Sequence, residues 1–118
     1  MNLTTCAALI VEDDQNVQRM LQYLLKKHCA SVDIASDGDA AIAMLQKSTY
    51  GLVVLDLMLP KTNGFQVAEA IGNLPYKPRL IVHSAIARYF ENSFPEGTVV
   101  LQKPFDIGHI EEELQKLA

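Results

Sequence analysis

Short apolar runs alternate with helically spaced apolar stripes along the chain. Each run is a near-continuous stretch of apolar residues, a pattern typical of strands that are buried on both faces of a parallel sheet. The predicted strands cover residues 7–11, 32–35, 52–55, 80–82 and 99–101.

The segments between these runs predict helices. After the first run, apolar residues fall at i, i+3, i+4, i+7 and i+8 from Val17, which places them on one helical stripe. Asp13 or Asp14 can cap the start of this helix. Further helices are expected at about residues 39–47, 65–71 and 107–117.

Strands separated by helices imply right-handed β-α-β crossovers and a doubly wound, flavodoxin-like parallel sheet with helices on both faces. The chain has 118 residues, of which 49% are hydrophobic, so it can bury one core and has no room for a second. We therefore expect a single α/β domain.

Charge and cysteine content narrow the class of function. The net charge of −4 argues against electrostatic binding to nucleic acid or to an anionic membrane. No apolar run approaches the roughly 18 residues that a membrane-spanning helix needs. Cys6 and Cys29 lack metal-binding spacing and are expected to be small buried residues in a reduced, cytoplasmic protein.

Polar side chains follow four of the predicted strands, and parallel strands bring their carboxyl ends to one edge of the sheet. Crowded carboxylates repel one another unless a cation lies among them, and oxygen ligands favour Mg²⁺. A carboxylate beside Mg²⁺ and a lysine can attack phosphorus to form an acyl phosphate, while a nearby hydroxyl donates to a phosphoryl oxygen. The residues at these strand ends are Glu12, Asp13 and Asp14; Asp56; His83 and Ser84; and Lys103.

Taken in order, these residues resemble the receiver domain of two-component response regulators over about residues 7–117. The matching motifs are Glu12-Asp13, the stretch LVVLDLMLPKTNG around Asp56, Ser84-Ala85, and Lys103-Pro104-Phe105. The resemblance implies a five-stranded parallel sheet in the order 2-1-3-4-5 with five surrounding helices. It also implies a cis peptide bond between Lys103 and Pro104.

The resemblance assigns a role to each residue of the site. Asp56 would be the phospho-acceptor, Lys103 would contact the phosphoryl group, and Ser84 would supply the hydroxyl that switches. The Mg²⁺ ligands would be Asp13 and Asp56 directly, Glu12 through water, and the backbone carbonyl of Met58.

By the same resemblance, the phosphoryl group would come from a histidine kinase or a histidine phosphotransfer protein, and signalling would follow from a conformational change. The chain would not be an enzyme beyond catalysing its own phosphorylation and dephosphorylation. The donor would dock beside the first helix, near Gln15, Gln18 and Phe105. An output partner or a second copy would bind through residues 85–105. Residues 1–118 would form one receiver domain without an effector domain.

The sequence departs from the family between Ser84 and Lys103. The family usually has an aromatic residue three positions before the lysine, where this chain has Val100, and the segment is a few residues shorter than usual. Pro95 interrupts a helix there, so we expect the fourth helix to be short, displaced or irregular. The aromatic residues of this segment would fill the vacated space or form an exposed patch for a partner: Tyr89, Phe90 and Phe94.

Other functions fit the sequence less well. A phosphorylation-independent pseudo-receiver that binds partners constitutively is the main alternative. A dehalogenase-type phosphatase would need a second carboxylate where Met58 stands, and a flavin protein would need a phosphate loop where acidic residues follow the first strand.

Met58 and Ile86 are apolar and should position attacking water poorly, which predicts slow to moderate loss of phosphate. His83 is interpreted as a packed or surface histidine, because no second histidine has metal-ligating spacing.

Overall fold

The computed structural model describes residues 3–117, which form five strands, four α-helices and two 3-10 helices. In chain order the elements are η1 (Leu3–Thr5), β1 (Ala7–Val11), α1 (Gln15–Lys26), β2 (Ser31–Ala35), α2 (Gly38–Lys47), β3 (Leu52–Asp56), α3 (Gly64–Gly72), β4 (Arg79–Ser84), η2 (Ala87–Phe90), β5 (Val99–Gln102) and α4 (Ile107–Leu117).

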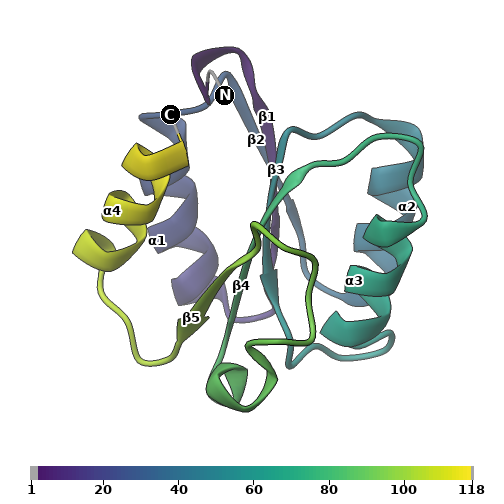
Figure 1. Ribbon diagram of the computed structural model, residues 1–118. Helices are drawn as coiled ribbons and strands as arrows, with labels where there is room; N and C mark the ends of the chain where they lie inside the picture. The colour runs from purple at the N-terminus through teal and green to yellow at the C-terminus, as the bar shows by residue number, and fades with distance from the viewer. Residues whose placement is uncertain (1–2, 118) are drawn as a thin grey trace.

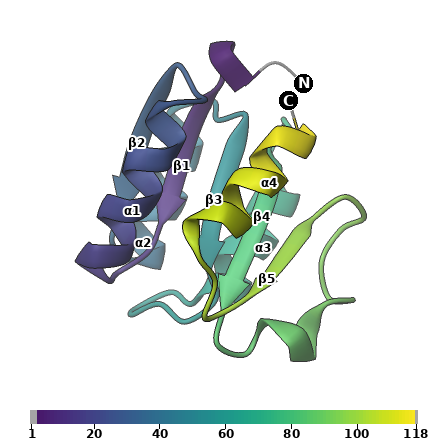
Figure 2. The same ribbon diagram turned by 90° about the vertical axis from the view of Figure 1, so that its left-hand side faces the viewer.

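The five strands form one parallel sheet in the order β2-β1-β3-β4-β5. The predicted α/β class and strand order are therefore confirmed. Helices α1 and α4 cover one face of the sheet, and α2 and α3 cover the other (Figures 1 and 2). All five strands point the same way, so the residues that follow them gather at one edge.

Each face of the sheet carries its own core. Leu24 and Leu114 pack on the α1/α4 face, and Leu45 and Val67 pack on the α2/α3 face. β3 lies in the middle of the sheet, and all five of its residues are buried. None of the helices formed by residues 3–117 is long and apolar enough to cross a membrane.

Polar caps determine where the helices begin. The Asp14 carboxylate accepts hydrogen bonds from the Asn16 and Val17 backbone N–H groups, so Asp14 caps α1 and leaves Asp13 free of that task. Asn63 caps α3 in a capping box with Gln66. Cys6 and Cys29 are buried free cysteines, as expected, and burial raises the pKa of Cys29 to about 11.

The connection from β4 to β5 holds only the short 3-10 helix η2, seen in green in Figures 1 and 2. The prediction of a short or irregular fourth helix is confirmed, whereas the family's count of five helices does not apply to the described chain. Pro95 cannot donate the backbone hydrogen bond of a continuing helix. Gly97, with a φ of 90°, then turns the chain back towards β5.

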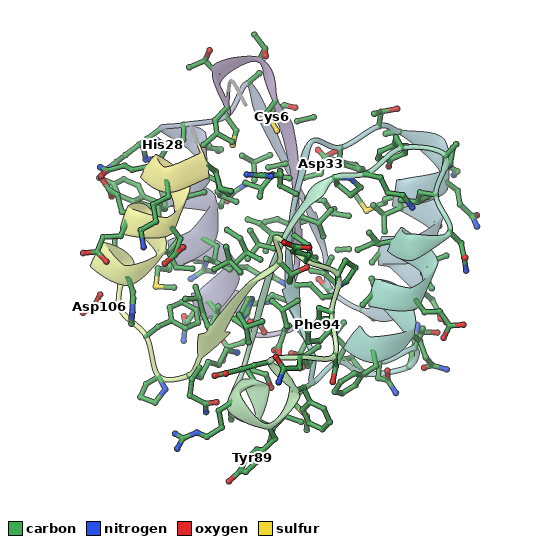
Figure 3. The ribbon with its side chains drawn as sticks, in the orientation of Figure 1. Cys6, His28, Asp33, Tyr89, Phe94 and Asp106 are labelled. Carbon is green, nitrogen blue, oxygen red and sulfur yellow. The ribbon has the colours of Figure 1, made fainter. Side chains whose placement is uncertain are left out.

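Aromatic side chains occupy part of the space that a longer helix would fill. The Phe65 ring at the start of α3 packs edge-on against Phe90, with centroids 4.8 Å apart, and stacks on Phe94 at 6.3 Å. Tyr89 is 76% exposed and points away from the domain (Figure 3). Phe90 and Phe94 therefore pack against the domain, while Tyr89 is exposed; a partner patch in this segment stays a prediction.

Candidate functional site

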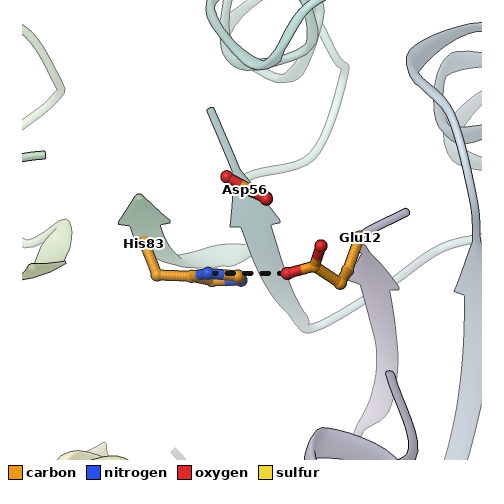
Figure 4. Close-up of side chains that lie close together, drawn as sticks. All are labelled: Glu12, Asp56 and His83. Carbon is orange, nitrogen blue, oxygen red and sulfur yellow. Dashed lines mark ion pairs between the residues drawn. The ribbon is translucent and has the colours of Figure 1, made fainter. Parts of the chain in front are cut away.

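Three buried polar side chains meet where β1, β3 and β4 end. Glu12 follows β1, Asp56 ends β3 and His83 lies in β4, where it pairs in register with Asp56 (Figure 4). They are 1%, 3% and 0% exposed, respectively. These three strands are neighbours in the sheet, so residues far apart in the sequence form one compact group.

Asp56 is held by backbone as well as by charge. Its Oδ1 accepts a hydrogen bond of 3.0 Å from the Met58 backbone N–H, and its Oδ2 lies 3.2 Å from Lys103 Nζ. Gly64 packs so closely behind it that a Cβ atom there would lie 2.4 Å from the Asp56 carbonyl oxygen. The start of α3 therefore fixes the backbone that carries this carboxylate.

Lys103 bridges the two carboxylates from the other side. Its Nζ lies 3.2 Å from Glu12 Oε1 and 3.2 Å from Asp56 Oδ2. Burial alone would lower the pKa of Lys103, but the charges of Asp56 and Glu12 outweigh this effect and raise it. The peptide bond to Pro104 is cis, as the resemblance implies. Lys103 is thus a cation aimed at the phosphoryl acceptor that was predicted.

Glu12 carries the largest electrostatic penalty of the acidic residues. Burial, with a smaller contribution from the charge of Asp56, raises its pKa to about 7 even though the Asp14 N–H and Lys103 oppose the change. One ammonium is shared between two buried carboxylates, so the site is short of positive charge. A divalent cation would correct this imbalance.

His83 is buried without any hydrogen bond from residues 3–117 to either ring nitrogen. Burial lowers its pKa to about 3, helped by the charge of Lys103, so the ring is neutral. The dashed line in Figure 4 joins Nδ1 to Glu12 Oε1 over 3.9 Å, which is too long for a hydrogen bond. Phe105 packs edge-on against the ring, with centroids 5.4 Å apart.

Ser84 ends β4 and is fully buried. Its hydroxyl oxygen accepts a hydrogen bond from the Ile86 backbone N–H at 3.3 Å, and its carbonyl accepts from the Lys103 N–H at 2.9 Å. Gln102 adds a second link, because its amide donates to the Ala85 and Lys103 carbonyls. The end of β4, which carries the hydroxyl, is therefore tied to the end of β5, which the lysine directly follows.

Asp13 and Met58 lie on the outer side of this group. Both are exposed, and they line one cavity together with Leu59 and Asn63. The oxygen donors that could face a hard cation are the carboxylates of Glu12, Asp13 and Asp56 and the Met58 carbonyl. This oxygen-rich, charge-deficient donor set fits Mg²⁺.

The expected donor-docking residues lie around the beginning of α1. Gln15 is exposed at the start of the helix. Phe105 lines a cavity with Val17 and Met20 beside Lys103. The Gln18 amide donates to the Glu12 carbonyl and to the Ser36 hydroxyl, so it supports the site from within the chain.

Two features of the site were missed from the sequence. Gln102 looked like an ordinary strand residue, and no local signal marks its contacts with residues 85 and 88. His83 is packed, as expected, but its unpartnered nitrogens depend on neighbours from other strands. A polar residue at the end of an otherwise apolar run was the available signal for His83.

Comparison with known proteins gives a consistent result. A model of the response regulator receiver domain family matches residues 8–115. The response regulator ArlR of Staphylococcus saprophyticus is 34% identical over 101 residues, which cover 84% of this chain and 46% of that protein. The chain therefore spans about half the length of the curated relatives it matches.

Solved structures show the same fold. The response regulator receiver domain from Methylobacillus flagellatus superposes with a TM-score of 0.77 at 27% identity, covering 97% of this chain and 99% of that one. The receiver domain of the sensor histidine kinase PA1611 from Pseudomonas aeruginosa, with a magnesium ion in its active site cleft, gives 0.80 at 20% identity. That match covers 95% of this chain and 96% of the other, and at this identity it supports the fold alone.

Proposed function

The chain belongs to the response regulator receiver domain family, and from this premise we propose that it accepts a phosphoryl group on Asp56. The observation that carries the proposal is the position of Asp56. It is buried at the end of the central strand, held by the Met58 N–H and faced by Lys103 at 3.2 Å. A carboxylate oriented in this way beside an ammonium is prepared for attack on phosphorus.

The reaction transfers a phosphoryl group from a phosphohistidine on a histidine kinase or a phosphotransfer protein. A carboxylate oxygen of Asp56 forms the new O–P bond, the P–N bond breaks, and the donor imidazole leaves with the electron pair. Oδ1 is the oxygen held by the Met58 N–H, and Oδ2 is the oxygen paired with Lys103. The chain itself acts as the acceptor, so no separate substrate is turned over.

Two side chains would then hold the phosphoryl group. The Lys103 ammonium would exchange its contact with Asp56 Oδ2 for one with a phosphoryl oxygen. The Ser84 hydroxyl, which now accepts from the Ile86 N–H, would donate its own proton to another phosphoryl oxygen. Mg²⁺, held by Asp13, Asp56 and the Met58 carbonyl, with Glu12 through water, would neutralise the charge on the transferring group.

The signal would arise as the added charge draws these donors inward. Ser84 and Lys103 are joined by a backbone hydrogen bond, and the Gln102 side chain links Lys103 to Ala85 and Arg88. Movement of Ser84 would therefore be passed to the segment that contains η2. Val100 has no ring to follow the hydroxyl, so this backbone-linked route takes the place of the family's aromatic switch.

The test is the intact mass of the protein after incubation with acetyl phosphate and Mg²⁺, and separately with a phosphorylated histidine phosphotransfer protein. We expect a gain of one phosphoryl group that is lost in Asp56→Asn and when Mg²⁺ is removed with a chelator. Asp33→Asn is the matched control, since Asp33 lies on the edge strand β2, where it accepts a hydrogen bond from Tyr50.

The outcomes separate clearly. Gain of mass in wild type and Asp33→Asn, but not in Asp56→Asn, supports the proposal. Equal gain in Asp56→Asn places the acceptor elsewhere. Absence of gain with both donors, in a protein that remains folded by circular dichroism, refutes phosphoryl acceptance.

A further inference from the structure

The buried group of Glu12, Asp56 and His83 contains a nitrogen donor that the proposed function does not use. One ligand atom from each side chain lies within 4.8 Å of the other two. All three come from the ends of adjacent strands, so the sheet itself holds their spacing (Figure 4). Ligands bound to one ion at about 2.0–2.2 Å lie about 3–3.6 Å apart in tetrahedral or cis octahedral geometry, so the three side chains would draw closer together when an ion binds.

His83 is aimed at the carboxylates without bonding to them. Both ring nitrogens are buried and unpartnered within the described residues, and a buried polar atom left in this state destabilises the fold unless a ligand satisfies it. Nδ1 lies 3.9 Å from Glu12 Oε1, which is longer than a hydrogen bond and slightly longer than the separation of two ligands of one ion. Phe105 packs against the ring and restricts its rotation.

The donor chemistry selects the kind of ion. Mg²⁺ prefers oxygen donors, whereas an imidazole nitrogen beside two carboxylates suits a first-row transition metal such as Co²⁺ or Zn²⁺. We infer that Glu12, Asp56 and His83 form a binding site for a divalent transition-metal ion, which differs from the magnesium site in its nitrogen ligand and shares Asp56 with it.

Lys103 is the competitor for this site. Its Nζ contacts the same two carboxylates, and the side chain is 26% exposed, so it has a path to solvent. A divalent ion bound by His83, Glu12 and Asp56 replaces the positive charge of Lys103 between the two carboxylates. The ion therefore removes from Asp56 the ammonium on which phosphoryl acceptance depends, and it competes with Mg²⁺ for the same carboxylate. This inhibitory consequence rests on the proposed function, whereas the binding of the ion does not.

The first test measures Co²⁺ binding by visible absorption and calorimetry in wild type, His83→Leu and His83→Gln. We expect either His83 substitution to lower the ratio of Co²⁺ affinity to Mg²⁺ affinity by about tenfold or more and to change the Co²⁺ spectrum. His109→Gln, which removes an exposed histidine of α4, is the matched control and should keep both values. An unchanged ratio and spectrum in both His83 variants would overturn the inference and leave a buried water as the partner of the ring.

A second measurement needs no variant. In wild-type protein, long-range proton–nitrogen NMR follows the His83 ring nitrogens during titration with Zn²⁺. A shift of one ring nitrogen that saturates with one ion per chain supports direct ligation. Ring nitrogens that keep their shifts at saturating Zn²⁺ refute it, even if both His83 variants fail to fold.

The consequence for function is tested by mass gain with acetyl phosphate and Mg²⁺, with and without Zn²⁺. Zn²⁺ should reduce the gain in wild type and reduce it less in His83→Leu, each compared with its own reaction without Zn²⁺. Equal sensitivity of the two proteins contradicts the inhibitory role. If wild type gains no mass with Mg²⁺ alone, the proposed function fails, while the Co²⁺ spectrum and the Zn²⁺ titration still decide whether the metal site exists.

Discussion

Replacing Glu12 with glutamine should make the metal-free protein more stable at neutral pH and alter the pH dependence of its stability. Glu12 is 1% exposed, its Oε2 accepts from the Asp14 N–H at 3.1 Å, and its Oε1 pairs with Lys103 at 3.2 Å. These contacts do not offset its burial, and its pKa is raised from 4.5 to about 7. Glutamine keeps the shape of the side chain and removes the charge.

The sign and the size of the effect follow from proton linkage. The folded state holds a proton on Glu12 that the unfolded state has released, so the stabilising contribution is complete below about pH 4.5 and is lost as the pH rises through about 7. A pKa difference of this size corresponds to about 3 kcal/mol. The free energy of unfolding of Glu12→Gln, minus that of wild type, should therefore increase by about 3 kcal/mol between about pH 4 and about pH 8.

The measurement is urea unfolding of both proteins in a chelator across that pH range. His83 has the opposite influence: its pKa is lowered from 6.5 to about 3, so its contribution is present above about pH 6.5 and is lost as the pH falls towards 3. Both proteins keep His83, so this contribution largely cancels in the difference. Glu112→Gln, on the exposed side of α4, controls for the loss of one surface charge.

Parallel curves for wild type and Glu12→Gln would refute the argument that burial of Glu12 is a net electrostatic cost. Addition of Mg²⁺ provides a second check. A cation among the carboxylates favours ionised Glu12, so millimolar Mg²⁺ should stabilise wild type more than Glu12→Gln at neutral pH. Equal stabilisation of the two proteins would place the ion away from Glu12.

The remaining predictions concern the surroundings of the site. Gly64→Ala should lower the free energy of unfolding by about 1–3 kcal/mol in urea, because its Cβ would meet the Asp56 backbone at 2.4 Å. Gly72→Ala, with nothing within 4 Å, should be neutral or stabilising by up to about 1 kcal/mol. Phe94→Ala should cost about 1–2 kcal/mol through loss of its stacking on α3, whereas exposed Tyr89→Ala should change stability by less than about 0.5 kcal/mol; equal losses would contradict the packing described. The phosphorylated protein should retain its phosphate for minutes or longer by mass spectrometry, and Met58→Asn should shorten that time; decay of wild type within seconds would contradict the role assigned to the apolar side chain.

Much of the fold could be predicted because it depends on local patterns. Five apolar runs and four helical stripes were enough to place every strand and α-helix to within about two residues. The run at 80–82 was the least complete, since β4 continues through His83 and Ser84. Polar residues at the end of a buried strand break the apolar pattern, although the backbone keeps its pairing with β3 and β5.

The candidate site was predictable as a set of residues but not as an electrostatic system. Strand ends in a parallel sheet converge, so Asp56 and Lys103 could be paired in advance. The pairing of Glu12 with Lys103 could not be predicted, because the two residues are 91 positions apart in the chain. The raised pKa of Glu12 could not be predicted either, because it depends on how much water the folded chain excludes. The same holds for Gln102, whose hydrogen bonds require the exact closure of the loop after β4.

The sequence by itself determined the alternation of strands and helices, an aspartate cap for α1, and the identity of the residues at the strand ends. These features depend on side-chain periodicity and on hydrogen bonds between near neighbours in the chain. Only the tertiary structure decided that His83 turns its unpartnered nitrogens towards Glu12, that one lysine serves two carboxylates, and that aromatic rings fill part of a missing helix. Those outcomes depend on burial and on the meeting of distant strands, which exist only once the sheet has formed.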